Sequence, residues 1–322
     1  MIMEKYKGLN VAITGGAGFI GSNLAEKLVG YGANVLIIDN LLYGNKASHL
    51  IGHKLLTIEK ADVRDAKAMT KLLDCVDIVF HLAAIVGVEE TQLDPYEVLD
   101  VEIGGTVNVL KACSTNKVKR FIFGSSSEVY GDSKEPMKED SCLAPRSTYA
   151  VTKLVGEEYC RAFHLKHGLK YSILRYFNIY GPRQDERFVI SRFIKRTLTN
   201  EPIIIYGDGK QTRDFTYIDD AVKGTLLAAS STKAIGEAFN LGTKVTTSIN
   251  QLASEITTTI SNKKIKPEYV DYDKTRPREI EIYNRLADIT KAEHVLGYSP
   301  SIDLRTGIKK LLSLDKRFSV IS

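Results

Sequence analysis

The chain has 322 residues, of which 26% are charged and 43% are hydrophobic, and its formal net charge is +5. These values are ordinary for a soluble globular protein that is long enough for a full core and more than one lobe. The Lys and Arg residues are spread without an arginine-rich tract, so nothing points to nucleic acid as a partner. No apolar run is long enough to span a bilayer, and residues 1–7 lack the apolar core of a signal peptide.

The four cysteines are Cys75, Cys113, Cys142 and Cys160, and they form no Cys-x-x-Cys pair and no metal-ligand cluster with the six histidines. Cys75, Cys113 and Cys160 lie in apolar stretches with helical spacing, where they are expected to pack as small hydrophobic residues. We therefore expect no metal site, and we expect a reducing, cytoplasmic compartment.

The first strong motif is the glycine-rich stretch of residues 14–24, Thr-Gly-Gly-Ala-Gly-Phe-Ile-Gly-Ser-Asn-Leu. An apolar run at residues 9–13 precedes it and an amphipathic segment follows, which is the strand, tight turn and helix of a dinucleotide site. In that reading Gly15 allows the turn, Gly18 admits a pyrophosphate close to the backbone, and Gly21 lets the helix pack closely. The amide groups and positive end of the helix attract phosphates. The alternative is an ordinary turn between a strand and a helix.

A second strand-like run, residues 34–38, ends at Asp39. A carboxylate at this place accepts hydrogen bonds from both hydroxyls of a ribose, and it repels a 2′-phosphate. The sequence therefore predicts NAD rather than NADP as the cofactor. If the glycine motif is a plain turn, Asp39 is only a solvated acid.

Strand-like runs alternate with helical patterns through the first half of the chain. The expected strands are Val11–Thr14, Val35–Asp39, Leu55–Glu59, Ile78–His81, Phe121–Ser125 and Ser172–Tyr176. The expected helices between the later strands are Tyr96–Thr115 and Tyr149–His167. This alternation predicts an α/β fold with a Rossmann-type doubly wound parallel sheet, whose ligands gather at the carboxyl ends of the strands.

The second half of the chain changes character and predicts a smaller, discontinuous lobe. Helices are expected at Phe188–Leu198, Ile218–Ala229, 248–260 and Ile289–Leu296, and short strands at Pro202–Tyr206 and Glu237–Leu241. Ser248 and Asp288 are suited to cap helix N-termini, and Gly297 is suited to end the last of these helices. We expect a dinucleotide-binding domain of residues 1–176 plus about 216–243, under a C-terminal lobe of residues 177–215 and 244–322.

The second strong motif is Tyr149-Ala-Val-Thr-Lys153, because residues four apart lie on one face of a helix. A free tyrosine has a pKa of about 10 and is a poor base at neutral pH. A Lys ammonium one turn away, together with a positive nicotinamide, would stabilise the phenolate and lower that pKa. Taken alone, the pair is more simply an accident of a solvated helix.

The third motif is a β-rich apolar run that ends in Ser125-Ser126-Ser127-Glu128. Its hydroxyls follow a strand, at the edge of the sheet where ligands gather. Three serines alone are usually a hydrophilic loop. Together with the glycine turn and the Tyr149/Lys153 pair, they indicate an active site.

In these motifs the chain resembles the extended short-chain dehydrogenase/reductase family, particularly its NAD-dependent nucleotide-sugar epimerases and dehydratases of the UDP-glucose 4-epimerase kind. The resemblance runs nearly end to end. It also includes Asp39-Asn40-Leu41, Asp62-Val63, His81-Leu82-Ala83-Ala84, Arg175-Tyr176-Phe177-Asn178, Tyr180-Gly181-Pro182-Arg183, Gly207-Asp208-Gly209, Arg213-Asp214-Phe215 and Gly297-Tyr298.

The resemblance implies roles for individual residues. Tyr149 is the acid/base, Ser126 matches the family's catalytic Ser/Thr, and Lys153 orients the ribose and lowers the pKa of the tyrosine. Glu128 is the fourth candidate catalytic residue. The implied cofactor contacts, with Asp62 and Val63 at the adenine, are Gly15, Gly18, Phe19, Ile20, Gly21, Asp39, Asn40, Asp62, Val63, Leu82, Ala83, Ala84, Tyr149, Lys153 and Tyr176.

The resemblance also implies a nucleotide-sugar-binding role for the C-terminal lobe. The implied substrate contacts are Ser126, Ser127, Asn178, Tyr206, Arg213 and Arg276. Asn178, Arg213 and Arg276 match positions that hold the diphosphate, which suits a guanidinium because it donates two parallel hydrogen bonds. For an isolated arginine, a surface charge is the simpler explanation.

The chain departs from the family pattern at three places. Glu102 stands where relatives usually carry Asn, and Arg278-Glu279 replaces a common Gly-Asp. Glu128 matters most, because many 4-epimerases have no acid there, whereas 4,6-dehydratases and uronate decarboxylases often do. In a dehydratase that carboxylate removes the C5 proton, and the equal alternative is a glutamate that only hydrogen-bonds its loop.

The resemblance implies an NAD-dependent nucleotide-sugar 4-epimerase, acting on a UDP-hexose or UDP-N-acetylhexosamine through a transient 4-keto sugar. The alternative is a 4,6-dehydratase or a UDP-glucuronate decarboxylase-type enzyme that uses Glu128. The acidic pair Glu89-Glu90 argues against a uronate, since it would repel a sugar carboxylate if it faces the site. A non-catalytic NAD-sensing protein is a further alternative, against which the intact Ser126, Tyr149 and Lys153 set argues.

The resemblance implies a homodimer as well. The expected helices Tyr96–Thr115 and Tyr149–His167 resemble the pair that forms a four-helix dimer bundle in this family. Val107, Leu110 and Leu154 lie on that face or, as the alternative, pack inward.

Overall fold

The computed structural model describes residues 2–261, 266–273 and 277–319. Its centre is a seven-stranded sheet in the order β11-β6-β5-β4-β1-β2-β3, in which all pairs of neighbours are parallel. The strands are β1 (Asn10–Thr14), β2 (Asn34–Asp39), β3 (Leu56–Lys60), β4 (Ile78–His81), β5 (Arg120–Ser126), β6 (Tyr171–Tyr176) and β11 (Glu237–Leu241). This arrangement confirms the Rossmann-type fold.

The apolar runs of the sequence become central strands because both faces of the sheet are covered. Every residue of β4, β5 and β6 is buried, which is typical of parallel strands between helical layers. Successive side chains point to opposite faces, so Ile13 and Phe80 belong to one core cluster and Ala12 and Val79 to the other. The strand order reverses between β1 and β4, and a crevice forms at such a point.

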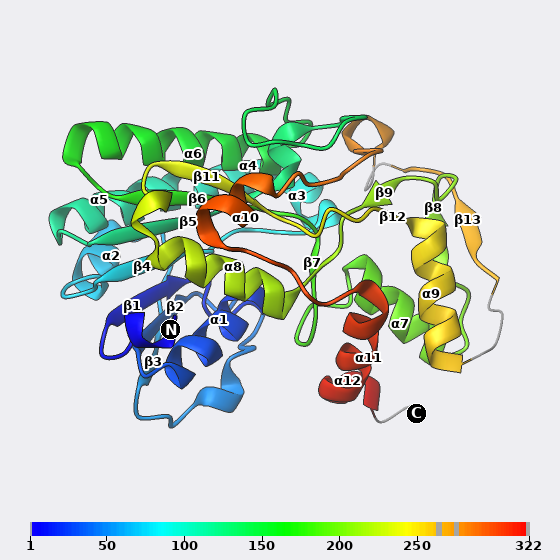
Figure 1. Cartoon of the computed structure of the whole chain (residues 1–322), viewed down its shortest axis with the longest axis horizontal. Coiled ribbons are helices and arrows are strands. Elements are labelled where there is room, and N and C mark those ends of the chain that lie inside the picture. The colour runs from blue at the N-terminus through cyan, green and yellow to red at the C-terminus, as the bar shows by residue number, and fades with distance from the viewer. Residues whose placement is uncertain (1, 262–265, 274–276, 320–322) are drawn as a thin grey trace.

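Helices form a layer on each face of the sheet (Figure 1). On one face α1 packs beside α8, and on the other α2, α5 and α6 lie side by side. The helices are α1 (Phe19–Gly30), α2 (Ala66–Leu72), α3 (Val88–Leu93), α4 (Pro95–Leu99), α5 (Gly105–Thr115), α6 (Thr148–His167), α8 (Ile218–Ser230) and α10 (Thr290–Leu296).

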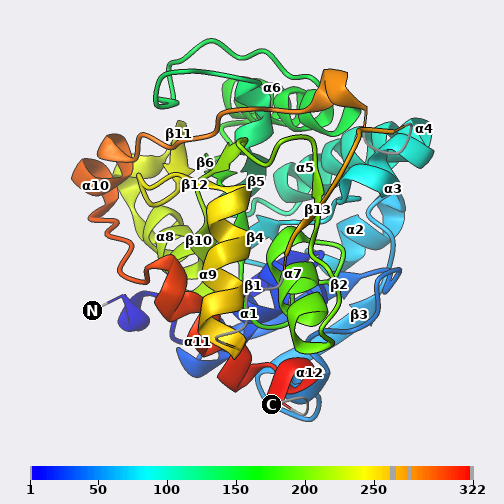
Figure 2. The same ribbon diagram turned by 90° about the vertical axis from the view of Figure 1, so that its right-hand side faces the viewer.

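A smaller group of elements lies at one end of the sheet, where α7 packs against α9 (Figure 2). These elements are α7 (Val189–Leu198), β8 (Ile204–Tyr206), α9 (Ile249–Ser261), β13 (Glu268–Val270), α11 (Leu304–Leu314) and α12 (Lys316–Ser319). Two pairs of short strands connect this group to the sheet. In one pair β7 (Ile179–Tyr180) is parallel to β10 (Thr216–Tyr217), and in the other β9 (Thr212–Arg213) is antiparallel to β12 (Thr247–Ser248). The proposed division of the chain into domains stays a prediction.

The helix expected over residues 96–115 is three segments, since a π-helical turn at Asp100–Gly104, labelled η3, separates α4 from α5. The helical direction continues through it, so the hydrophobic spacing does not reveal the break. Leu110 is fully buried, so the inward-packing alternative holds for it, whereas Leu154 is half-buried. Cys75 also differs from expectation, because it is exposed in a left-handed turn with φ 59°.

The predicted helix ends at Ser248 and Gly297 are confirmed, whereas the predicted N-cap at Asp288 is wrong. The Ser248 hydroxyl accepts a hydrogen bond from the Gln251 amide at 3.1 Å. The N-cap of α10 is Ile289, and the Asp288 carboxylate, one residue earlier, accepts a hydrogen bond from the Thr290 amide at 2.8 Å. Gly297 ends α10 with φ 67°. The helices α2, α3, α11 and α12 were not predicted from the sequence. Three of them, α2, α3 and α12, are short and show little periodicity, whereas α11 is longer. Within the described ranges, no helix combines the length and apolar character needed to cross a membrane.

Candidate active site

A cavity of about 480 Å³ opens at the carboxyl ends of the strands and extends to the C-terminal lobe. This volume is in the range of small-molecule sites. Its wall contains every residue singled out from the sequence as a catalytic, cofactor or substrate contact, except Arg276, which lies outside the described residues. The fold therefore brings together side chains from distant parts of the chain, although their individual roles stay predictions.

The glycine turn forms the floor of one end of the cavity. Gly15 has φ 68°, and a Cβ there would lie 2.7 Å from the Ala83 amide nitrogen, so the turn requires glycine. A Cβ on Gly21 would lie 2.6 Å from the Cα of Gly16. Gly21 thus lets α1 begin directly against the turn. Gly18 precedes the first turn of α1 and lines the cavity, so the helix N-terminus faces the ligand space.

Asp39 is fixed at the end of β2 by the backbone around it. Its carboxylate accepts hydrogen bonds from the Ala17 amide at 3.0 Å and from the Leu41 amide at 2.8 Å. Burial raises the pKa of Asp39, while these two amides and the Lys46 ammonium oppose the rise. Asp39 lines the cavity, and each of its carboxylate oxygens can accept a further hydrogen bond, which is the capacity that two ribose hydroxyls require.

Asp62 is held by an arginine that the sequence analysis did not single out. The Arg64 guanidinium lies 2.9 Å from the Asp62 carboxylate and holds the pKa of Asp62 down at about 2. Arg64 also pairs with Glu97 and Asp100 at 3.0 Å each. The network ties the segment after β3 to α4 and fixes this part of the wall. In the sequence, Arg64 directly follows the Asp62-Val63 pair, and this position is the signal that could have drawn attention to it.

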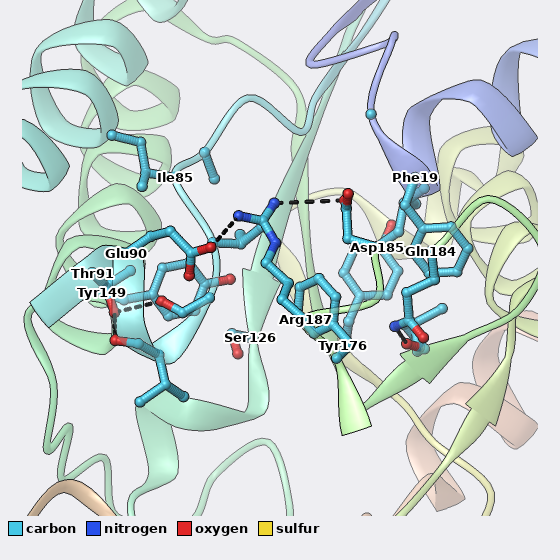
Figure 3. Close-up of a pocket in the computed structure, with 18 of the residues that line it drawn as sticks. Phe19, Ile85, Glu90, Thr91, Ser126, Tyr149, Tyr176, Gln184, Asp185 and Arg187 are labelled. Atoms are coloured by element: carbon cyan, nitrogen blue, oxygen red, sulfur yellow. Dashed lines mark hydrogen bonds and ion pairs between the residues drawn. The ribbon is translucent and has the colours of Figure 1, made fainter. Parts of the chain in front are cut away.

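Tyr149 lies in the cavity wall, half-buried near the start of α6 (Figure 3). Burial raises its pKa well above the ordinary range, and the Glu102 and Glu128 carboxylates raise it further, whereas the Ser126 hydrogen bond lowers it. The Lys153 ammonium lies 5.3 Å from the centre of the Tyr149 ring, on the same helix face. Lys153 is paired with Glu102, so the protein's own charges do not produce the lowering expected from the sequence.

Glu128 is partly held by neighbouring side chains. Its carboxylate accepts a hydrogen bond from the Ser147 hydroxyl at 3.2 Å and lies 3.7 Å from the Arg285 guanidinium. Arg285 lines the cavity, and its Nε has no hydrogen-bond partner within the described part of the chain. Burial lowers the pKa of Arg285 to about 10, so the group stays a cation at neutral pH. No sequence motif marks Arg285.

Unpartnered polar atoms line the substrate end of the cavity. Ser127 Oγ and Asn178 Oδ1 are buried without a hydrogen-bond partner among the described residues, a condition that a bound polar ligand would relieve. The Arg213 guanidinium is already engaged, because it pairs with Glu281 and donates to the Ile282 carbonyl at 2.7 Å. Tyr206 lies in the same wall, at the end of β8.

A further arginine connects the two sides of the cavity (Figure 3). Arg187 precedes α7, donates to the Glu90 carboxylate of α3 at 2.6 Å, and lies 3.6 Å from Asp185. Its guanidinium also stacks 4.2 Å from the centre of the Tyr43 ring. Glu89 and Glu90 both line the cavity, which was the condition for their repelling the carboxylate of a uronate. The charge of Glu90 is, however, balanced by Arg187.

No group of three or more His, Cys, Asp or Glu side chains is arranged to hold a metal ion in the described ranges. The cavity instead suits a dinucleotide and a polar substrate. The first end offers a helix N-terminus and the Asp39 carboxylate, and the second offers hydroxyl, amide and guanidinium groups.

Comparison with known proteins agrees with this geometry. The model of the NAD dependent epimerase/dehydratase family matches residues 11–242. The UDP-N-acetyl-alpha-D-glucosaminuronate decarboxylase of Bacillus cytotoxicus is 40% identical over 313 residues, covering 93% of this chain and 95% of that protein. A putative UDP-glucose 4-epimerase of Methanocaldococcus jannaschii is 40% identical over 309 residues, covering 94% and 97%. The crystal structure of a UDP-glucuronic acid 4-epimerase from Bacillus cereus, in complex with UDP-glucuronic acid and NAD, has a TM-score of 0.90 at 35% identity, covering 96% and 99%.

Proposed function

The chain belongs to the NAD-dependent epimerase/dehydratase family, and we propose that it is a 4-epimerase of UDP-linked sugars that acts through a transient 4-keto intermediate. The substrate in this proposal is a UDP-hexose or a UDP-N-acetylhexosamine. The observation that supports it is the single acid/base set of Ser126, Tyr149 and Lys153 beside the glycine turn of one cavity. Epimerisation at C4 needs one such set and room for the keto sugar to turn.

The residues of the cavity fit NAD, through the α1 N-terminus, the Asp39 carboxylate and the close backbone approach at the glycine turn. When bound there, NAD supplies the acceptor for the C4 hydride and returns the hydride to the opposite face of the sugar. In this mechanism Tyr149 removes the proton of the 4-hydroxyl and later gives it back. Ser126 donates a hydrogen bond to the same sugar oxygen and orients it.

The test is to incubate the purified protein with UDP-, GDP-, dTDP- and CDP-linked sugars, with hexoses, N-acetylhexosamines and uronates in the UDP set. We expect a UDP-hexose or UDP-N-acetylhexosamine to be converted to its C4 epimer, without net formation of NADH. Loss of mass from the sugar, as water or CO₂, would refute the 4-epimerase. A failure of every sugar nucleotide to reduce bound NAD⁺ transiently would refute a C4 enzyme altogether.

A second candidate function is oxidative decarboxylation of a UDP-uronate, and Arg285 is the observation that favours it. A guanidinium that is buried, faces the cavity and pairs only loosely with Glu128 at 3.7 Å is suited to a sugar carboxylate. The Arg187–Glu90 pair removes part of the repulsion that argued against such a substrate. Oxidation at C4 makes a uronate a β-keto acid. The C5–C6 bond then breaks, CO₂ leaves, and the electron pair forms an enolate that is protonated at C5.

We also propose that the protein is a homodimer through α5 and α6. Large apolar side chains remain exposed on α6 at Val151, Tyr159 and Leu165, and Leu154 lines a shallow apolar groove beside them. Burying such a patch against its copy would remove apolar surface from water. The four cysteines are all free thiols, which supports the proposal of a reducing, cytoplasmic compartment.

A further inference from the structure

The candidate acid/base set contains a fourth charged group, the Glu102 carboxylate. Its Oε2 lies 3.2 Å from the Lys153 ammonium, and the two side chains are only 2% and 5% exposed. The Thr152 hydroxyl donates to the same oxygen at 2.9 Å. This pair is therefore a buried ion pair, whose desolvation is costly and whose close geometry offsets part of that cost.

Glu102 lies in the π-helical turn between α4 and α5. Such turns are rare and often occur at functional sites, because the extra residue of the turn redirects a side chain. The Ile85 backbone amide also stabilises the Glu102 carboxylate. Burial raises the pKa of Glu102, and the main opposing influence is the Lys153 ammonium. The negative charge of Glu102 is therefore stabilised mainly by the Lys153 ammonium, and the ammonium is in turn paired with this carboxylate.

The charges around Tyr149 cancel in pairs. Glu102 faces it from the π-helical turn and Lys153 from its own helix, while Glu128 and Arg285 face it from the serine loop and from the segment before α10. The two carboxylates and the two cations therefore leave no net charge beside Tyr149. Nearby His81 stays neutral, since burial and the Lys153 charge lower its pKa to about 3.

We propose that Glu102 is a positioning residue that acts through Lys153: its carboxylate balances the ammonium, so that Tyr149 stays neutral until the positive nicotinamide of NAD⁺ lies beside it. The inference rests on the proposed roles of Tyr149 and Lys153. With all other charges balanced, a phenolate would be an unpaired anion in the wall of the cavity, and the nicotinamide is the charge that can pair with it. The base would then form only when the hydride acceptor is in place.

The test measures the ionisation of Tyr149 directly, without any sugar nucleotide. Tyrosines carrying ¹³C at the ring carbon that bears the hydroxyl are titrated by NMR, and the resonance missing in Tyr149→Phe identifies Tyr149. In the wild-type protein we expect the midpoint to fall when NAD⁺ is added, and to fall less with NADH, whose nicotinamide is neutral. In NAD⁺-bound Glu102→Gln we expect a midpoint at least about one pH unit below that of the wild type, because one nearby negative charge is gone.

Two further variants make the test decisive. Thr152→Val removes the hydroxyl from the same carboxylate oxygen without changing charge, so its midpoint should stay close to that of the wild type. Glu102→Asn removes the charge with a shorter side chain, and it replaces Glu102→Gln if that variant does not fold. An unchanged or higher midpoint in the neutral variants would overturn the inference. Because the measurement contains no substrate, it fails or succeeds independently of the 4-epimerase proposal.

Discussion

Replacing Asp39 with Ala tests two roles of one carboxylate, the selection of the cofactor and the stabilisation of the backbone around it. We propose that the carboxylate excludes a 2′-phosphate by charge, and it also accepts hydrogen bonds from the amides of Ala17 and Leu41 at 3.0 and 2.8 Å. The variant should therefore bind NADP⁺ better relative to NAD⁺ and also lose stability. Hydrogen bonds to a charged group contribute about 1.5–3 kcal/mol each. Because water reaches part of this site, we expect a total loss of about 2–4 kcal/mol.

The matched control is Asp39→Asn, which removes the charge but keeps one acceptor oxygen for one of the two amides. It should change the cofactor preference as much as Asp39→Ala, with roughly half the loss of stability. Calorimetric titration with NAD⁺ and NADP⁺ measures the preference, and urea unfolding measures the stability. If both variants keep the full preference for NAD⁺, the carboxylate does not select the cofactor. If the wild-type protein binds NAD⁺ and NADP⁺ equally well, the prediction that Asp39 selects NAD is wrong.

Three further predictions concern the base, the core and the dimer. Tyr149→Phe should lower turnover by about 10²- to 10⁴-fold while NAD stays bound, and near-normal turnover would place the base elsewhere. Burial raises the pKa of Asp214 to about 6, so this carboxyl binds its proton more tightly in the folded than in the unfolded state. Its contribution to the free energy of unfolding should fall by about 3 kcal/mol as the pH rises from about 4 to 6. Asp214→Asn should remove that contribution, measured by urea unfolding of both proteins at the two pH values. Leu165→Glu together with Tyr159→Lys should give a monomer by light scattering, and a wild-type monomer at micromolar concentration would exclude the dimer.

The parts of the site that were predictable from sequence are those whose partners are close in the chain. The glycine turn needs only its own backbone conformation, and Tyr149 and Lys153 need only one helical turn between them. Asp39 was found because it ends an apolar run, although its ties to the Ala17 and Leu41 amides were not visible. The doubly wound parallel sheet followed from the alternation of strands and helices.

The remaining part depends on contacts made only by folding. Arg285 meets Glu128 across almost half of the chain, and Arg187 meets Glu90 across the cavity, so no local spacing signals either pair. The π-helical turn is hidden because hydrophobic spacing continues through it. Glu102 drew attention only as a departure from Asn, and its partner Lys153 became evident from the structure.

A variant of Glu128 separates the proposed 4-epimerase from a 4,6-dehydratase and from a decarboxylase. All three reactions begin with oxidation at C4 by the same base, so Tyr149 cannot separate them. A 4-epimerase never breaks the C5–H bond, whereas a 4,6-dehydratase must break it and a decarboxylase must protonate C5. In Glu128→Gln the amide oxygen still accepts from Ser147, and the loss of a negative charge favours ionisation of Tyr149, since that charge raises its pKa. The Arg285 cation loses its partner at 3.7 Å, a loose pair whose removal should cost modest stability.

For a 4-epimerase we therefore expect Glu128→Gln to keep its turnover within about tenfold of the wild type. A carboxylate that transfers the C5 proton would instead contribute about 10²- to 10⁴-fold, and its loss would be evident in the same assay. Glu128→Asp is the control, because it keeps the charge but withdraws the carboxylate from Ser147. The products are formed in heavy water and analysed by NMR for deuterium at C5. Deuterium at that carbon would refute the 4-epimerase. A 4-keto-6-deoxy sugar would then identify a 4,6-dehydratase, and released CO₂ would identify a decarboxylase.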